Sequence, residues 1–162
     1  DLSAQLLLGL RYEFGRNVPK NESKCIKWYT RAAEQGYAAA QCFLGCFYQN
    51  KNNSDSQKTA IEWFSKAASQ YHALALYNLG HCYQFGHGVA KNDLLAVQLY
   101  TSGAIQGNAE AQHRLGYCYQ HGDGVLHDEV KAFEWYEKAA CQGVAGAQFN
   151  VGLYFENGFR GA

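Results

Sequence analysis

The segment from Arg114 to Val125, RLGYCYQHGDGV, brings histidine, cysteine, aspartate and three glycines together. Histidine, cysteine and aspartate can bind a metal ion, and a Gly-x-Gly turn can hold a phosphate group. A closely similar segment, NLGHCYQFGHGV, runs from Asn78 to Val89. Two copies of one pattern indicate either a duplicated chemical site or a repeated structural unit, and the spacing along the whole chain decides between them.

The chain repeats itself with a period of about 36 residues. A glycine recurs at intervals of 36, 35, 36 and 36 residues, at Gly9, Gly45, Gly80, Gly116 and Gly152. An alanine precedes each of these glycines by five residues, and an aromatic residue follows each by three. A second series consists of Trp28, Trp63, Leu99 and Trp135. We therefore expect a single repeat domain over residues 1–162, with repeats at 3–38, 39–73, 74–109 and 110–145 and the first helix of a fifth at 146–162.

Each repeat is predicted to hold two helices. The second helix is expected to begin at an N-cap seven residues before the tryptophan position, at Asn21, Ser56, Asn92 and Asp128. It is expected to end at a left-handed glycine, at Gly36, Gly107 and Gly143, with a strained end at Tyr71 in the second repeat. The Gly-x-Gly turns then join the two helices. A missing side chain at the recurring glycine lets the helices approach closely, and we expect the tryptophan to fill the larger gap further along.

The fourth repeat carries the pattern most completely, in Ala111, Leu115, Gly116, Tyr119, Gly122, Gly124, Ala132, Trp135, Tyr136, Lys138, Ala139, Ala140, Gly143 and Ala145. This pattern resembles the Sel-one-like repeat family, relatives of the tetratricopeptide repeats. The resemblance implies an all-α fold, a right-handed α-solenoid of antiparallel helix pairs. It also implies a protein-interaction scaffold or adaptor with no shared catalytic residues. The second repeat departs from the pattern, because residues 50–54 replace its Gly-x-Gly turn.

The first helices are expected to line the concave side of such a solenoid. At 100° per residue, the third, seventh, tenth and eleventh positions from each alanine lie opposite the core. These positions carry aromatic residues, histidine and glutamine with no lysine or arginine, a composition typical of interfaces. We predict a groove for a peptide or helix of a protein partner, in which glutamines bind the peptide backbone. The candidate residues are Cys42, Cys46, Gln49, Tyr77, His81, Gln84, Phe85, His113, Tyr117, Gln120, His121 and Phe149. Four apolar residues of this face lie near the ends of the chain: Leu6, Leu10, Phe149 and Leu153. Their apolar character is explained equally well if sequence beyond either end covers them.

We expect no metal ion, no cofactor and no enzyme activity. Cys42 and Cys46 have a workable spacing for two ligands, but equivalent cysteines on neighbouring helices lie about 10 Å apart, too far to share a zinc ion. A nucleophilic pair of Cys46 and His81 lacks a third orienting group. The turn at Gly122 and Gly124 has neither the strand nor the lysine of a phosphate loop, so phosphate binding is not expected there.

Charge and cysteine usage limit the partners and the location. Acidic and basic residues balance at 14 each, which excludes a strongly basic nucleic-acid surface. The apolar runs are too short for membrane insertion. Cysteines without a within-repeat pairing pattern favour the cytoplasm, whereas glycosylation sequons at Asn21 and Asn52 leave the ER lumen or an extracytoplasmic location as the alternative. End-to-end self-association through Val151, Tyr154 and Phe155 is a further alternative.

Overall fold

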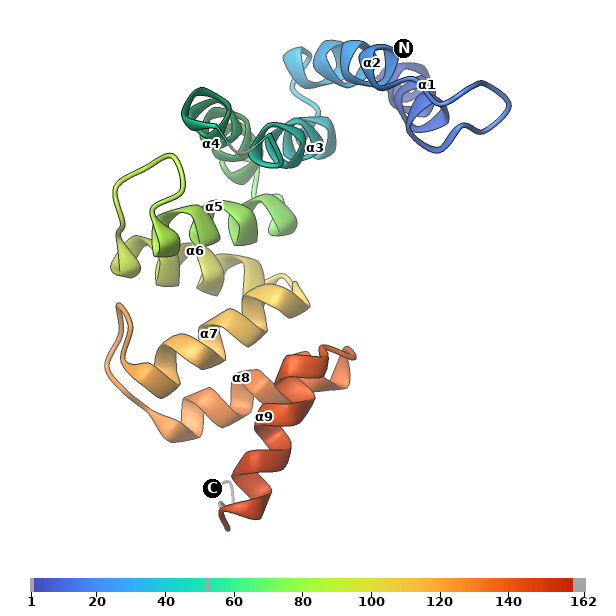
Figure 1. Ribbon diagram of the computed structural model, residues 1–162. Helices are drawn as coiled ribbons and strands as arrows, with labels where there is room; N and C mark the ends of the chain where they lie inside the picture. The colour runs from blue at the N-terminus through green and yellow to red at the C-terminus, as the bar shows by residue number, and fades with distance from the viewer. Residues whose placement is uncertain (1, 52, 159–162) are drawn as a thin grey trace. The chain divides into compact units, whose positions relative to one another are not determined.

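A computed structural model describes residues 2–51 and 53–158. Over these residues the chain forms nine α-helices and no β-strand, as the sequence predicts. The helices are α1 (Leu2–Phe14), α2 (Glu22–Glu34), α3 (Ala38–Gln49), α4 (Ser54–Ala68), α5 (Ala73–Phe85), α6 (Asp93–Ile105), α7 (Ala109–His121), α8 (Glu129–Cys141) and α9 (Ala145–Glu156) (Figure 1).

The helices group into two compact units, Asp1–Ala75 and Leu76–Ala162. In unit 1, α1 packs on α2, α2 on α3 and α3 on α4. In unit 2, α6 packs on α7, α7 on α8 and α8 on α9. Within each unit a helix therefore packs on its neighbours in the sequence, which is the arrangement expected of helix pairs (Figure 1). A single repeat domain over residues 1–162 stays a prediction.

Three of the four predicted N-caps are confirmed. The side chains of Asn21, Asn92 and Asp128 accept hydrogen bonds from backbone amides at 2.9, 3.0 and 3.0 Å. The prediction for Ser56 is wrong, because Asn53 caps α4 and accepts a 2.9 Å hydrogen bond from the Ser56 amide. Asn53 has the extended backbone that an N-cap requires, and α4 consequently starts almost a full turn earlier.

The second helices end in the left-handed conformation, as predicted. Gly36, Gly107 and Gly143 have φ values of 90°, 86° and 89°. Tyr71, the residue at this place in the second repeat, has φ 58°, which confirms the strained end. A residue with a Cβ pays a steric cost in this conformation that glycine does not.

The recurring glycines allow close helix packing. A Cβ at Gly45 would lie 2.4 Å from a ring carbon of Phe64, and one at Gly116 would lie 2.8 Å from a ring carbon of Tyr136. The ring that covers the glycine belongs to the residue after the tryptophan position, and Trp135 packs further along, against the buried cluster that contains Tyr100 and Leu115. Tyr136 lies four residues after Ala132 on the buried stripe of α8, whereas Trp135 is only half-buried, with Lys138 Nζ 4.1 Å from its ring centroid.

Glutamines join consecutive repeats, a role that we did not predict from the sequence. The Gln41 side-chain amide donates to the Ala33 carbonyl at 3.0 Å, and Gln112 donates to the Ala104 carbonyl at 3.1 Å. Both glutamines are buried, and each bonds a carbonyl in the last turn of the preceding second helix. The same carbonyls also accept bonds from the Gly36 and Gly107 amides at 3.0 Å, so each glutamine adds a second hydrogen bond at the helix end. The recurring Ala-Gln pair in the sequence is the signal for this role.

Candidate functional site

Aromatic and imidazole rings cover neighbouring first helices of unit 2. We define the α5–α7 face by Tyr77, His81, Phe85, His113, Arg114, Tyr117 and His121. On α5 the ring centroids of His81 and Phe85 lie 4.6 Å apart, and His87, from the following loop, lies 5.5 Å from His81. Phe85 remains 48% exposed despite these contacts. The i, i+4 spacing places Tyr77, His81 and Phe85 in one row along the helix.

A second row of rings lies on α7. Tyr117 and His121 stack with their centroids 4.0 Å apart and their planes 22° apart, and Tyr117 is 37% exposed. The His113 ring lies 5.6 Å from that of Tyr136, and its Nε2 lies 3.4 Å from the Asn150 amide nitrogen on α9. These contacts hold the rings in place, so the surface is formed before any partner binds.

Arg114 connects the two rows. Its guanidinium carbon lies 5.5 Å from the Phe85 ring centroid, a cation–π contact between α7 and α5. Arg114 was not among the predicted residues, because only the third, seventh, tenth and eleventh positions of each first helix were assigned to this side. Arg114 occupies the fourth position, which at 100° per residue points within 20° of the eleventh and so lies on the same side. Its position next to His113 and three residues before Tyr117 was the available signal.

Two half-buried imidazoles of this face, those of His81 and His113, are neutral at pH 7. Burial lowers the pKa of His81 from 6.5 to about 4, helped by the positive charges of Arg114 and His87. Burial and Arg114 also lower the pKa of His113, and Glu110 partly opposes this. Neutral imidazoles can stack on a ligand and form hydrogen bonds with it. Arg114 is the member of the face that carries a permanent charge.

The expected exposure of the glutamine row is wrong for Gln84. Gln84 is 6% exposed, and its Oε1 accepts a 2.8 Å hydrogen bond from the Tyr100 hydroxyl. Its amide nitrogen lies 3.8 Å from Cys118 Sγ. The half-buried Gln120 accepts a 2.8 Å hydrogen bond from Tyr136 in the same way. These glutamines therefore hold helix pairs together.

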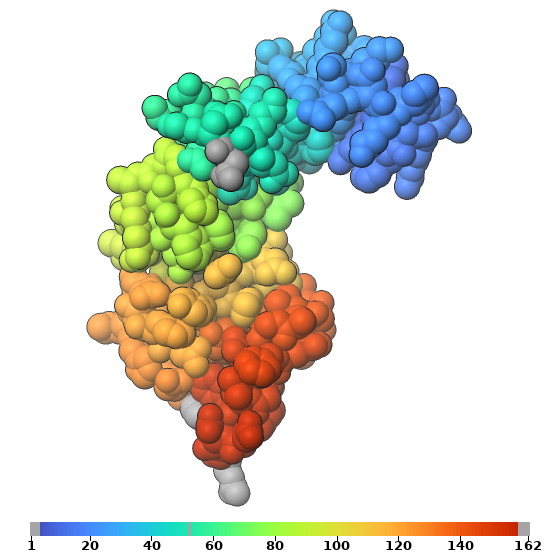
Figure 2. Space-filling model, in the orientation of Figure 1, coloured from blue at the N-terminus to red at the C-terminus, as the bar shows by residue number. Residues whose placement is uncertain are grey.

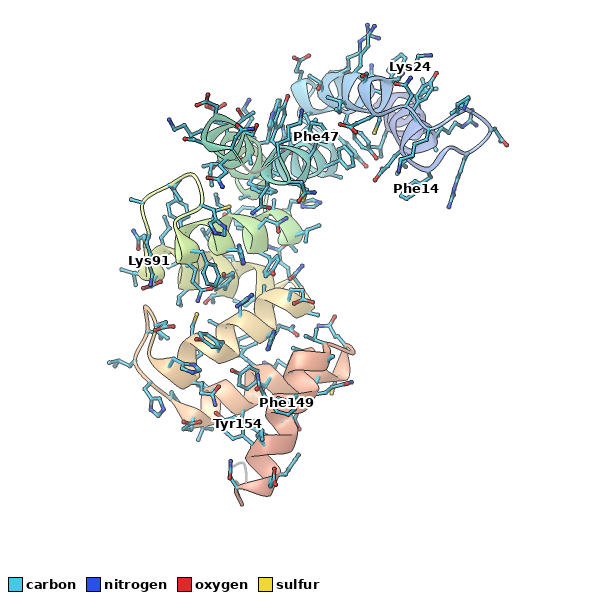
Figure 3. The ribbon with its side chains drawn as sticks, viewed as in Figure 1. Phe14, Lys24, Phe47, Lys91, Phe149 and Tyr154 are labelled. Atoms are coloured by element: carbon cyan, nitrogen blue, oxygen red, sulfur yellow. The ribbon has the colours of Figure 1, made fainter. Side chains whose placement is uncertain are left out.

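Two candidate residues of unit 1, Cys42 and Cys46, line an apolar cavity of about 430 Å³. The cavity lies between α1 and α3 and is lined by Leu6, Leu10, Phe14, Phe43 and Cys46, among others. The expected exposure of Cys42 is wrong, because only 2% of its surface is accessible. Cys46 and Gln49 are half-buried. Phe14, at the end of α1, stays exposed (Figure 3).

At the other end of the described chain, α9 lies at the surface (Figure 2), and it carries exposed apolar side chains. Phe149 is exposed there, and Figure 3 shows it on the same helix as Tyr154. The expected exposure of Tyr154 is wrong. It is 7% exposed, donates a hydrogen bond to Glu129 and has its ring 5.6 Å from that of Phe133. Phe155 is exposed and Val151 half-buried, so Phe155 is the better test of contacts at this end.

Over residues 2–51 and 53–158, no cluster of three or more His, Cys, Asp or Glu side chains could hold a metal ion. No disulfide joins any of the six cysteines, all of which lie in these ranges. No helix of the described chain has the length and apolar character to cross a membrane.

Five consecutive segments of the chain match the Sel1 repeat model, at residues 2–37, 38–72, 73–108, 109–144 and 145–162. The chain therefore belongs to the Sel1 repeat family. Each segment begins one residue before the repeat expected from the sequence. The predicted fold class, an all-α solenoid of antiparallel helix pairs, is confirmed. Sel1 repeat proteins are generally non-catalytic scaffolds for protein–protein interaction.

Solved structures agree with this assignment. The chain is 37% identical to c5321, a protective antigen present in uropathogenic Escherichia coli strains that displays an SLR fold, with a TM-score of 0.91 over 98% of this chain. It is 34% identical to a Sel1 repeat protein from Oxalobacter formigenes, with a TM-score of 0.84 over 96% of this chain. Helicobacter pylori cysteine rich protein B, 24% identical over 79% of this chain and 92% of its own, shares the fold with a TM-score of 0.61.

The chain spans 34% of the c5321 chain and 64% of the Oxalobacter chain. A search of curated proteins gave no match.

Proposed function

We propose that this chain is a scaffold that binds a peptide segment or helix of another protein on the α5–α7 face. The observation that carries the proposal is the array of partly exposed rings on two neighbouring first helices, with Phe85 48% and Tyr117 37% exposed. Aromatic residues and arginine are enriched at the centres of protein interfaces. The function is binding without catalysis, and nucleic acid and membrane are not among the partners.

The order already present in the rings supports this choice. His81 contacts Phe85, and Tyr117 stacks on His121, so these side chains lose little freedom when a partner covers them. A pre-formed surface reduces the entropy cost of binding. The proposed contact set keeps Tyr77, His81, Phe85, His113, Tyr117 and His121, and adds Arg114. It omits the buried Cys42 and Gln84, assigns Gln120 to the helix pair, and leaves Cys46, Gln49 and Phe149 as separate candidates.

Affinity capture tests the proposal. The wild-type chain and the double variant Tyr77→Ala, Tyr117→Ala are immobilised, and proteins retained from a lysate are identified by mass spectrometry. Tyr71→Ala serves as the matched control, because it removes a tyrosine that is 72% exposed and lies in unit 1. We expect the wild type and the control to retain a protein that the double variant loses. Equal retention by all three would place binding outside the α5–α7 face.

Self-association through α9 is the second candidate. No described atom lies within 4 Å of a Cβ built at Gly152, whereas a second-helix ring lies within 3.0 Å of one built at each of the other four recurring glycines. A helix of a second copy could cover this site and the exposed Phe155. Sedimentation velocity of the wild type and of Phe155→Ser tests it, and a monomeric wild type contradicts it.

We propose a reducing compartment, the cytoplasm, as the location. Burial raises the pKa of the Cys25 thiol to about 11 and that of Cys118 to about 12, so neither forms a thiolate readily near pH 7. Counting free thiols by mass after rapid alkylation of the isolated protein in denaturant, which exposes the buried cysteines, tests this proposal. Six alkylated cysteines are expected, whereas fewer would favour the ER lumen or an extracytoplasmic location.

A further inference from the structure

The Arg114 guanidinium lacks an anionic partner within the described chain. No carboxylate oxygen of residues 2–51 or 53–158 lies within 4.0 Å of its nitrogens. Glu110 precedes it by one helical turn, a spacing that often pairs, but it does not come within this distance. The contact that Arg114 makes is with the Phe85 ring, 5.5 Å from its guanidinium carbon.

Arg114 is also partly withdrawn from water. Its side chain is half-buried, and it lines a cavity of about 560 Å³ together with Glu110, His113 and residues 142–146. The cation lowers the pKa of His81 and of His113, which shows that its field reaches both neighbouring imidazoles. A half-buried cation with no counter-ion gains more from an incoming carboxylate than a fully hydrated one does.

We propose that the α5–α7 face recognises a peptide segment containing an aspartate or glutamate side chain, whose carboxylate pairs with Arg114. Apolar residues of the same segment cover Phe85 on one side and Tyr117 on the other. The inference rests on the function proposed above and adds the chemistry of the partner. The guanidinium offers a planar pair of donors that matches a carboxylate, so the pairing also fixes the register of the segment.

The position of Arg114 favours a side-chain carboxylate over the end of a chain. Phe85 of α5 lies against the guanidinium, and Tyr117 follows it by three residues on α7. Exposed rings therefore lie near the charge on two different helices, and we expect a segment that covers both rings to carry the partner carboxylate within its length. A chain terminus at Arg114 would leave one of the two ring surfaces uncovered.

Selection from a random peptide display library tests the inference. The full 162-residue chain is the target, and the selected sequences are made as acetylated and amidated peptides, so that side chains supply the only carboxylates. Binding is then measured for the wild type, for Arg114→Gln and for Arg114→Glu. Lys58→Gln is the charge-matched control, since Lys58 is exposed on α4 in unit 1. Circular dichroism confirms that each variant is helical.

We expect the selected peptides to share an acidic residue beside apolar ones. Arg114→Gln should weaken their binding about tenfold or more, Arg114→Glu should weaken it further, and Lys58→Gln should not change it. Replacing the acidic residue of the peptide by its amide should weaken binding to the wild type by the same factor. The same replacement should change the affinity for Arg114→Gln little. If Arg114→Gln and the change in the peptide weaken binding independently, so that the two factors multiply, the proposed pairing is overturned.

Two other outcomes separate this inference from the proposed function. Peptides that need Tyr77 and Tyr117 but carry no acidic residue would support the binding face and overturn the role of Arg114. A wild-type chain that selects no peptide above the level of its Tyr77→Ala, Tyr117→Ala variant would overturn both.

Discussion

The Tyr100 hydroxyl donates a 2.8 Å hydrogen bond to Gln84 Oε1 and so ties α6 to α5 inside unit 2. Equivalent bonds run from Tyr136 to Gln120 at 2.8 Å and from Tyr29 to Glu13 at 3.0 Å. The acceptor is the tenth position of a first helix in each case. In these three repeats the hydroxyl of the second helix is therefore a structural reason for glutamine or glutamate at this position, whereas the second repeat has Gln49 with Phe64 in place of the tyrosine.

Removing the Tyr100 hydroxyl should lower the free energy of unfolding more than removing the Tyr136 hydroxyl does. Tyr100→Phe leaves the buried Gln84 oxygen without its donor, and an unsatisfied buried group costs about 1–3 kcal/mol. Tyr136→Phe should cost about 1 kcal/mol or less, because Gln120 is half-buried and water can replace the bond. Urea unfolding measures both. Equal losses would contradict the role of burial, and Gln84→Leu should make Tyr100→Phe much less costly.

A methyl group at two equivalent glycines should have opposite effects. In Gly116→Ala the new Cβ would lie 2.8 Å from the Tyr136 ring, and such overpacking destabilises by about 1–3 kcal/mol. Gly152→Ala adds its methyl group where no described atom lies within 4 Å, and alanine is the better helix former by about 1 kcal/mol. Thermal unfolding should show a lower Tm for the first variant and an equal or higher Tm for the second. A neutral Gly116→Ala would remove the packing reason for this glycine.

The helix end at Tyr71 should tolerate glycine better than tyrosine. Tyr71 has φ 58° and is 72% exposed, so Tyr71→Gly relieves backbone strain and loses little packing. We expect stabilisation by about 0.5–1 kcal/mol, the strain relief less the entropy cost of glycine. Gly107→Ala, at φ 86°, is the reverse change and should destabilise by about 1 kcal/mol. Destabilisation by Tyr71→Gly in urea unfolding would show that the Tyr71 ring makes a contribution to stability.

Much of the fold could be predicted from the sequence because the same residue pattern recurs in each repeat. Gly116 and Gly143 recur in register with equivalents elsewhere, and both occupy the places that their spacing predicts. The N-cap of α4 could not be placed by register, because the second repeat has lost its Gly-x-Gly turn. Asn53 and Ser56 are both good caps by residue type, and the backbone conformation decides between them.

The candidate site was harder to predict. A helical wheel gives the direction of a side chain from one helix but not the reach of its neighbours. On the helical wheel Gln84 points away from the buried face of α5. The Tyr100 side chain of α6 nevertheless reaches it and donates a hydrogen bond, and Gln84 is buried. Arg114 occupies a position on the exposed side of the wheel that was not assigned to it, and its contact with Phe85 on another helix could not be read from one wheel. Long polar side chains are where such directional reasoning fails.

Acid should destabilise the fold through His81. Its pKa is about 4 in the folded chain, below the ordinary 6.5, so the unfolded chain binds more protons between these values. Its contribution to stability is therefore present above pH 6.5 and is lost as the pH falls toward 4. The loss between pH 7 and pH 5 should be about 1–2 kcal/mol. His81→Phe should reduce this loss in urea unfolding, and an unchanged pH dependence would contradict the burial of this imidazole.

The most direct test of the binding face is the affinity of one captured partner segment for four versions of the chain. These are the wild type, Tyr77→Ala with Tyr117→Ala, the control Tyr71→Ala, and the end variant Phe155→Ser. Truncating aromatic residues at the centre of an interface typically costs 2 kcal/mol or more each. We therefore expect the double variant to bind at least about 30-fold more weakly, while the other two bind like the wild type. Unchanged affinity of the double variant, with its helical content intact, would contradict binding on the α5–α7 face.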